Sequence, residues 1–382
     1  MPLIPYMYDQ NISSPSFVMR LRNVSNTRIL WELPGGVLAI EMDWSGTASD
    51  AYNFYQTYLG YRIILMDESL IFPVAEGWVF GIAIAPFGCR ILCKGAWQRH
   101  FDEFDDTAYD ISNSTSTLIK ASLTNFVPVI NSDQSNIDET TTAGTAGTWD
   151  LSEYGLYPGD LITKLAAVSN ENLNQWNYWV QSAPLNNILP QKPIAYFKEQ
   201  VDDGTFNWQI NKRDLGAGGF TQERNIDELA NEVIVIYRDI AGEQGITSWA
   251  TDTDSQSMFW TKQIILTGGE MATSWATQYR DLMLSKLKNP LLRRSSVITS
   301  KYIMDDKKQQ WPLWYVIKNG GGYLRINDLY PESALFGESH DTKRIGQIMT
   351  AEYNDAAYAL SISLDTTDEG ADAMLAQIQT FL

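Results

Sequence analysis

Short stretches in which apolar and polar positions alternate recur along this chain and predict β-strands rather than helices. In the first third the predicted strands lie at 18–21, 37–42, 61–66, 76–84 and 89–94. Near the C-terminus they lie at 314–318, 323–326, 343–353 and 357–364. Many of these stretches are rich in β-branched and aromatic residues, which pack well on a pleated surface. Short strands at this spacing favour a sandwich or a small barrel.

The middle of the chain mixes strands and helices. Strands are predicted at 176–180, 193–198 and 206–210, and the nearly continuous apolar run at 231–239 predicts a strand buried on both faces. A short helix is expected from residue 158 with Asp160 as its N-cap. The longest helix is expected at 269–288, with an apolar stripe made of Trp275, Tyr279, Leu282, Met283 and Leu287.

These patterns predict an α+β, β-dominated fold with two barrel-like or sandwich β domains and a few packed helices. We expect an N-terminal barrel-like domain at 1–105 that is completed by 343–382. A second, α/β domain is expected at 106–230, with an exposed low-complexity loop at 132–148. Residues 231–342 are expected to supply a strand, the long helix and a C-terminal β segment, and a last helix is expected from Thr366.

The composition favours a structural role. The chain has 2 His and 2 Cys but 13 Trp, 19 Tyr and 14 Phe, so the residues that most often transfer protons or bind metals are scarce. Cys89 and Cys93 would share one face of a strand at about 13 Å, too far apart for a disulfide, and we expect two buried thiols.

The net charge and the shortness of the apolar runs exclude some classes of binding partner. The formal net charge of −18 argues against a phosphate-binding surface, because affinity for nucleic acid depends on clustered Lys and Arg. No apolar run approaches the roughly 20 residues that a membrane-spanning helix needs. The first residues lack the basic start and apolar core of a secretory signal, so synthesis in a cytoplasm is expected.

Several motifs could carry chemistry, and each has a simpler interpretation. The three glycines at 320–322 lack the pattern of a phosphate loop and predict a turn. Asp252 and Asp254 could offer oxygens to calcium, but the spacing is that of a solvated loop. His100 precedes an acidic run that would favour its charged form. We predict a protein that is not an enzyme, with no catalytic residue, no cofactor and no metal site; a hydrolase with paired carboxylates is a remote alternative.

Three aromatic residues, Trp176, Tyr178 and Trp179, stand out as a cluster. They could form a platform on which sugars stack, which would make the chain a carbohydrate-binding or receptor-binding protein. Alternating aromatic residues are more often found in a core or at a subunit interface. Both interpretations remain open at the level of the sequence.

The order of several segments resembles a known family. These segments are the strand pair at 61–65 and 76–84, the run Cys89-Arg90-Ile91-Leu92-Cys93-Lys94-Gly95-Ala96-Trp97, and the stretches 160–165, 230–235 and 344–353. In this order they resemble minor tail proteins of tailed bacteriophages, of the baseplate or tail-tip hub type.

That resemblance implies a virion protein that forms a homotrimeric ring between the tail tube and a distal spike or fibre. Its implied neighbours are the tail tube or distal tail protein, the spike or fibre and the tape measure protein, while DNA only passes through the lumen. The C-terminal strands would return to pair with the N-terminal barrel. The chain departs from the family in its loop at 132–148 and in the absence of a lysozyme or peptidase domain, which argues against cell-wall degradation.

Overall fold

The structure of the chain is a computed structural model that describes most of its 382 residues. The described residues are 3–11, 14–69, 72–110, 113–132, 136–137, 148–150, 156–167, 176–186, 189–199, 205–216, 220–226, 229–239, 242–270, 273–329 and 345–365. The predicted loop at 132–148 lies largely outside these residues, and the predicted helix from Thr366 lies entirely outside them.

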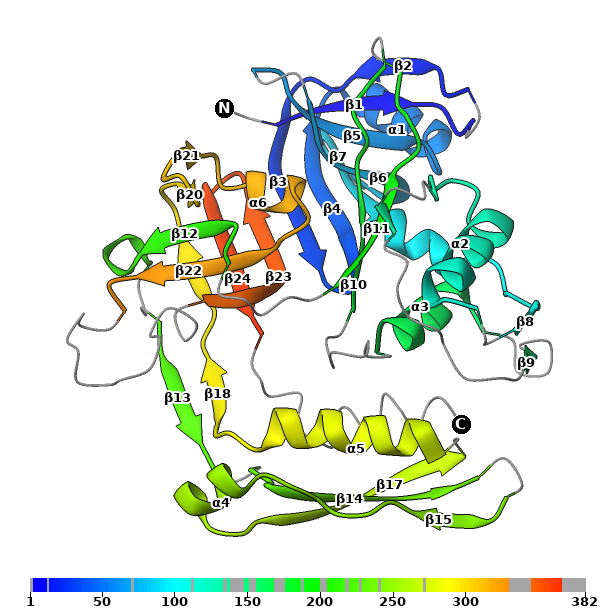
Figure 1. Cartoon of the computed structure of the whole chain (residues 1–382). Coiled ribbons are helices and arrows are strands. Elements are labelled where there is room, and N and C mark those ends of the chain that lie inside the picture. The colour runs from blue at the N-terminus through cyan, green and yellow to red at the C-terminus, as the bar shows by residue number, and fades with distance from the viewer. Residues whose placement is uncertain are drawn as a thin grey trace.

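Seven antiparallel strands from the N-terminal part form one end of a large sheet (Figure 1). In spatial order they are β2 (Phe17–Arg20), β1 (Ile4–Tyr8), β5 (Arg62–Asp67), β6 (Phe72–Ala85), β7 (Gly88–Gly95), β4 (Gly35–Ser45) and β3 (Val24–Glu32). The predicted strands in this region are confirmed by β2 and β4 to β7. The pattern did not predict β1, β3 or helix α1 (Ala48–Thr57), which buries Ala51 and Phe54.

The same sheet continues into strands from the C-terminal part. These are β23 (Ile345–Asn354), β24 (Ala359–Leu364), β22 (Tyr323–Asn327), β12 (Trp208–Asn211), β19 (Val297–Thr299), β20 (Ile303–Asp305) and β21 (Gln310–Trp311). β23 pairs with β3, so Ala351 lies opposite Trp31 and Tyr353 opposite Ile29. One apolar core therefore extends under both groups of strands.

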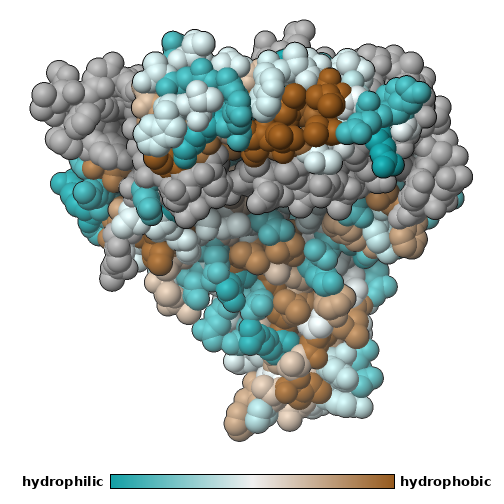
Figure 2. Space-filling model, turned by 90° about the horizontal axis from the view of Figure 1, so that it is seen from below, coloured by the Kyte–Doolittle hydropathy of each residue, from teal (hydrophilic) through white to brown (hydrophobic). Residues whose placement is uncertain are grey.

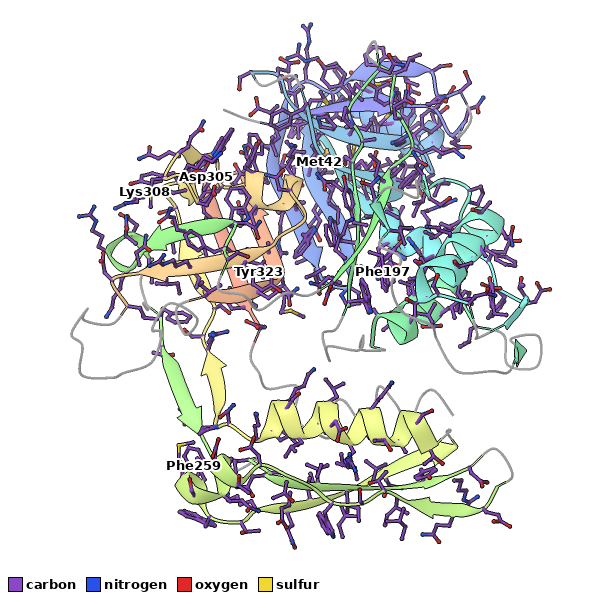
Figure 3. All side chains as sticks on the ribbon, in the orientation of Figure 1. Met42, Phe197, Phe259, Asp305, Lys308 and Tyr323 are labelled. Carbon is purple, nitrogen blue, oxygen red and sulfur yellow. The ribbon has the colours of Figure 1, made fainter. Side chains whose placement is uncertain are left out.

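A mixed α/β unit packs beside the N-terminal strands. It contains η1 (Ala96–Phe101), β8 (Ala108–Asp110), α2 (Thr115–Phe126), β9 (Thr148–Asp150), α3 (Pro158–Ala167), β10 (Trp176–Gln181) and β11 (Ile194–Glu199). Its core is separate from the first one, and Figure 3 shows Phe197 in this core and Met42 in the other. The predicted N-cap at Asp160 is wrong, because α3 already begins at Pro158.

A third unit lies apart from the others in Figure 1 and is joined to them by the two-stranded ribbon of β13 (Gln222–Asn225) and β18 (Leu291–Arg294). We call it the outlying unit. It contains β14 (Glu232–Arg238), β15 (Gln244–Ile246), β16 (Ala250–Thr251), α4 (Thr253–Phe259), β17 (Gln263–Glu270) and α5 (Thr273–Leu287). α5 confirms the predicted long helix, and the core beneath it includes Tyr279, Leu282 and Met283.

The predicted fold class, α+β and β-dominated, is confirmed. One predicted strand is wrong: residues 315–318 form the short helix α6 (Tyr315–Lys318). The apolar run Trp314-Tyr315-Val316-Ile317 suits either element, and such short runs cannot be assigned by periodicity alone. Cys89 and Cys93 are both buried free thiols, as predicted, and burial raises the pKa of Cys89 to about 11.

The two faces of β17 give a direct test of the packing in the outlying unit. Leu266 is fully buried beneath α5, whereas its neighbour Thr267 is exposed. We expect Leu266→Ala to lower the free energy of unfolding by about 2–5 kcal/mol, because it leaves a cavity in the core. Thr267→Ala is the control and should change stability by about 0.5 kcal/mol or less. Chemical denaturation measures both, and equal losses would contradict this packing.

Candidate interaction surfaces

The three aromatic residues of β10 do not form one platform. The strand alternates, so Trp176 and Tyr178 point into the core of the mixed unit, where they are 4% and 0% exposed. Trp176 stacks on Phe197 with ring centroids 4.9 Å apart. Trp179 points the other way and stacks on Tyr196 at 5.0 Å. A sugar could not reach Trp176 or Tyr178 without opening the core, which argues against the sugar-binding interpretation.

Trp179 instead lies at a junction within the chain. A Cβ atom added at Gly320, where φ is +73°, would come within 2.2 Å of the indole Nε1 of Trp179. The amide of Gln181 on the same strand donates to the carbonyl oxygen of Lys318. These contacts join the mixed unit to the C-terminal strands. A role for Trp179 in contacts between subunits stays a prediction.

His100 is a buried, neutral side chain. Its Nδ1 lies 3.0 Å from the carbonyl oxygen of Trp97, and its Nε2 lies 2.7 Å from the hydroxyl of Tyr178. Nδ1 therefore carries the hydrogen, and Nε2 accepts from Tyr178. Burial lowers the pKa of His100 to about 3. The expectation that neighbouring carboxylates would favour its charge is wrong, because the ring turns away from them into the core.

The acidic residues considered as candidate sites in the sequence form hydrogen bonds or ion pairs within the chain. Asp105 is buried and accepts hydrogen bonds from the hydroxyls of Tyr109 and Ser122 at 2.7 and 2.6 Å. Asp252 caps α4 by accepting from the backbone N–H of Ser255 at 2.9 Å, and it pairs with Lys288 at 2.9 Å. These bonds lower the pKa of Asp252. Within the described residues, no group of three or more His, Cys, Asp or Glu side chains could hold a metal ion.

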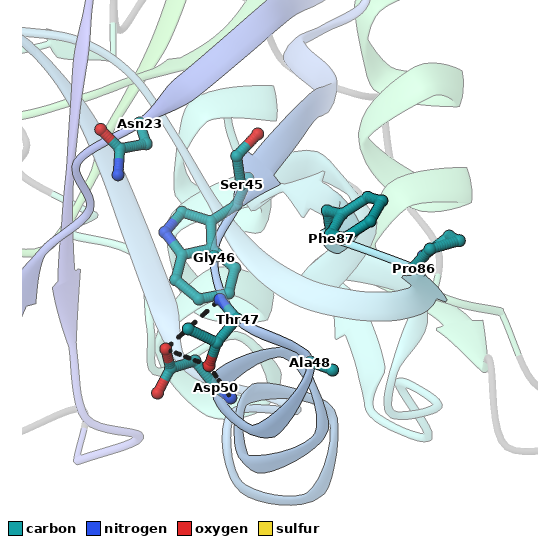
Figure 4. Close-up of a pocket in the computed structure, with 9 residues that line it drawn as sticks. Asn23, Ser45, Gly46, Thr47, Ala48, Asp50, Pro86 and Phe87 are labelled. Carbon is teal, nitrogen blue, oxygen red and sulfur yellow. Dashed lines mark hydrogen bonds between the residues drawn. The ribbon is translucent and has the colours of Figure 1, made fainter.

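A hollow of about 660 Å³ opens between the end of β4, the start of α1 and the turn between β6 and β7. Figure 4 shows Phe87 and Pro86 on one side and Thr47 with Asp50 on another. Thr47 and Asp50 satisfy each other in a capping box, since the N–H of Asp50 donates to the Thr47 hydroxyl and that hydroxyl donates to the Asp50 carboxylate. Thr47 and Asp50 thus serve to start α1, and Phe87 is the most exposed apolar side chain of the lining.

The β6–β7 hairpin carries three exposed apolar side chains, of which Phe87 lines this hollow. Phe80, Ile84 and Phe87 are 59%, 49% and 82% exposed, and the Nζ of Lys94 lies 3.7 Å from the centre of the Phe80 ring. No charged residue occurs from position 77 to position 89. β5 pairs with β6 only as far as Trp78, so the following residues of β6 pair with β7 alone among the described strands. The hairpin therefore combines exposed apolar side chains with an open strand edge.

A second apolar surface covers the outlying unit on the side away from α5. β14 alternates, with Val233 and Val235 buried under α5 and Ile234 and Ile236 only half-buried on the opposite face. The predicted burial of this strand on both faces is therefore wrong. No described element covers the outer face, and Figure 2 shows an apolar patch there when the molecule is viewed from below.

The strand register makes this outer face continuous. Ile246 of β15 lies opposite Ile236, and Ile265 of β17 lies opposite Ile234. Ile246 and Ile265 are 59% and 61% exposed. We call these four residues the isoleucine face. The sequence did not reveal it, because a run of apolar residues in one strand does not say which of its faces is covered.

A strained residue lies at one border of the isoleucine face. Trp260 is 65% exposed and has φ +51°, a conformation that bulky residues rarely adopt. The buried Asn231 holds it there: its amide donates to the carbonyl oxygen of Trp260 at 2.8 Å, and its own oxygen accepts from the N–H of Lys262 at 2.8 Å. Strain of this kind persists only where the surroundings enforce it, and it is common at functional sites.

Comparison with solved structures shows that the chain has the fold of several tail proteins, two of them from prophages. Similar structures are the 43 kDa tail protein of prophage MuSo2 from Shewanella oneidensis (TM-score 0.55, 11% identity), the tail protein from Neisseria meningitidis MC58 (0.56, 9%) and the prophage tail protein gp18 from Listeria monocytogenes EGD-e (0.53, 12%). In the same order, the three matches cover 97%, 98% and 99% of this chain. They cover 100%, 99% and 100% of the matched chains. No family model and no curated protein sequence matches the chain.

The burial of His100 predicts a specific loss of stability in acid. Its folded pKa of about 3 lies below the unfolded value of about 6.5, so between these values the unfolded chain binds the extra proton. The free energy of unfolding should therefore fall by up to about 1.4 kcal/mol per pH unit as the pH drops from about 6 to 4.

His100→Gln should remove that part of the slope, so that stability plotted against pH is flatter in this range than for the unmodified chain. Chemical denaturation at a series of pH values measures both curves. Thr267→Ala, at an exposed residue that does not titrate, is the control and should keep the slope. Equal slopes for the His100→Gln variant and the unmodified chain would mean that His100 titrates normally.

Proposed function

We propose that this chain is a structural subunit of a bacteriophage tail, a hub at the tail tip that forms a trimeric ring. In that ring it joins the tail tube to a distal spike or fibre. The observation that carries the proposal is the match of nearly its whole length to nearly the whole length of three tail proteins, two of them from prophages. A match over one domain alone would not support a common role.

The physical character of the described residues supports the same role. A single sheet continues through two groups of strands, which suits a rigid ring segment. Exposed apolar side chains gather on the β6–β7 hairpin and on the outer face of the outlying unit, as is common where subunits contact neighbours. The polar groups that resemble catalytic residues, such as His100 and Asp105, are buried and engaged in hydrogen bonds.

The proposed neighbours follow from the position in the tail. The tail tube or distal tail protein and the tape measure protein would lie on one side of the ring, and the spike or fibre on the other. The net charge of −18 supports a lumen through which DNA passes without binding, since like charges repel. The chain would be made in the host cytoplasm and end in the virion.

The domain division at 1–105 with 343–382, 106–230 and 231–342 remains part of this proposal. The pairing of β23 with β3 supports completion of the N-terminal part by C-terminal strands. The outlying unit, which runs from β14 to α5, begins at Glu232 and ends at Leu287, well before residue 342. We therefore propose it as a separate module within that last segment.

Gold labelling of intact phage particles tests the proposed position. Particles of the phage that encodes this chain, with an epitope tag on the chain, should bind gold only at the end of the tail that is distal to the head. A tag on the tail tube protein is the control and should label along the whole tail. Gold on the head or along the tube would contradict the proposal. Intact particles that do not contain the chain would also contradict it.

A further inference from the structure

The hollow between β4, α1 and the β6–β7 turn has walls that the backbone holds in place. Its volume of about 660 Å³ lies within the range of small-molecule sites. The N–H of Ser45 donates to the carbonyl oxygen of Asn23, and the N–H of Gly46 donates to that of Phe87, both at 3.0 Å. Figure 4 shows Asn23 and Phe87 on opposite sides of Ser45 and Gly46. The hollow is therefore formed before any ligand arrives.

Trp44 adds a fixed hydrogen-bond donor to the lining. Its indole stacks on Phe54 with ring centroids 5.5 Å apart. The six-membered ring of the indole also lies against Gly46, where an added Cβ atom would come within 2.4 Å of it. The indole N–H forms no hydrogen bond to a described residue. A ligand in the hollow can therefore accept from it.

Two further polar side chains of the lining have bonding capacity to spare. The amide of Asn23 forms no hydrogen bond to a described residue, and it can both donate and accept. Asp50 is the one charged residue of the lining. Its Oδ2 accepts from the Thr47 hydroxyl at 2.6 Å, and its Oδ1 accepts from no described residue. The hollow thus offers a donor, an acceptor and a group that is both.

This set of groups determines which charge a ligand can have. An anion would lie beside the Asp50 carboxylate, and the lining contains no Lys, Arg or His to offset the repulsion. An ammonium ion would suit Asp50, but it has donors only and cannot accept from the indole of Trp44. A hydroxyl both donates and accepts. A neutral ligand with several hydroxyls therefore satisfies every polar group of the hollow.

The ring of Phe87 requires that the same ligand also has an apolar side. Phe87 is 82% exposed, the highest value among the large apolar side chains of the described residues. A sugar carries C–H groups on the faces of its ring and hydroxyls at its edge, so it can pack on an aromatic ring and still form hydrogen bonds. A purely apolar group would instead leave the indole N–H and the carboxylate without partners, which is costly.

We propose that this hollow binds a neutral sugar. The C–H face of the sugar packs on Phe87, while its hydroxyls accept from Trp44 and Asn23 and donate to Oδ1 of Asp50. This binding activity goes beyond the proposed structural role and does not depend on it. The site also differs from the aromatic cluster of β10, in which Trp176 and Tyr178 are buried.

Fluorine nuclear magnetic resonance of the full chain, labelled with 5-fluorotryptophan at its 13 tryptophans, tests the site. The probes are the methyl glycosides of glucose, galactose, rhamnose and N-acetylglucosamine at millimolar concentrations. The line of Trp44 is identified as the one that Trp44→Phe lacks. At least one of these sugars should shift that line, and the lines of the other tryptophans should stay in place.

Three variants then assign the contacts. Phe87→Ala should weaken binding by about 10-fold, because the stacking surface is lost. Asn23→Gly should weaken it by about 5-fold, and glycine accepts the φ of +59° at this position. Phe80→Ala is the matched control, because Phe80 belongs to the same hairpin, is 59% exposed and does not line the hollow. It should bind as the unmodified chain does, and circular dichroism checks the fold of all three.

Several outcomes would overturn the proposal. One is that none of the four sugars shifts the Trp44 line, and another is that Phe87→Ala and Phe80→Ala lose affinity equally. Binding of methyl glucuronide in preference to methyl glucoside would contradict the exclusion of anions. If 4-methylphenol shifts the Trp44 line and no sugar does, the hollow receives an aromatic side chain of a partner protein. The gold labelling tests the tail role separately, so each of these results would remove the sugar site alone.

Discussion

The antiparallel pairing of β3 with β23 is the constraint on which the rest of the structure depends. It joins residues 28–32 to residues 350–354 and places Ile29, Trp31, Ala351 and Tyr353 in one core. On the exposed side Arg28 bonds Glu352 through two hydrogen bonds of 2.7 and 2.8 Å, but an exposed ion pair adds little to stability. The backbone hydrogen bonds between β3 and β23 and the buried side chains therefore stabilise this junction.

Glycines let other elements approach this junction closely. Gly321 has φ +74°, and a Cβ atom there would come within 2.3 Å of the ring of Trp31, so only glycine fits. Its carbonyl oxygen accepts a hydrogen bond from the indole of Trp208 at 2.7 Å. The turn at 320–322 that the sequence predicts thus also holds β12 and β22 against β3. The β6–β7 hairpin and the outlying unit extend from this frame (Figure 1).

The sequence predicted elements with a clear period and missed those whose identity depends on distant partners. Alternation identified β4 to β7, and the spacing of Tyr279, Leu282, Met283 and Leu287 identified α5. Helix α1 was missed because only Ala51 and Phe54 on it are buried, so its apolar face is narrow. The isoleucines and valines of β14 form one run, which predicts a doubly buried strand, and only the position of α5 tells which face is covered. The aromatic cluster shows the same limit: Trp176 and Tyr178 share a face, and only the fold shows that this face is a core, while an interface role for Trp179 stays a prediction.

Cryo-electron microscopy of the intact tail tests the central claim most directly, namely that this frame is a ring segment that works through contacts between its copies. The reconstruction should show three copies around the tail axis below the tube, each with its continuous sheet in the wall of the ring. A single copy, a ring in which copies touch only through other proteins, or a tail tip without this fold would contradict the account.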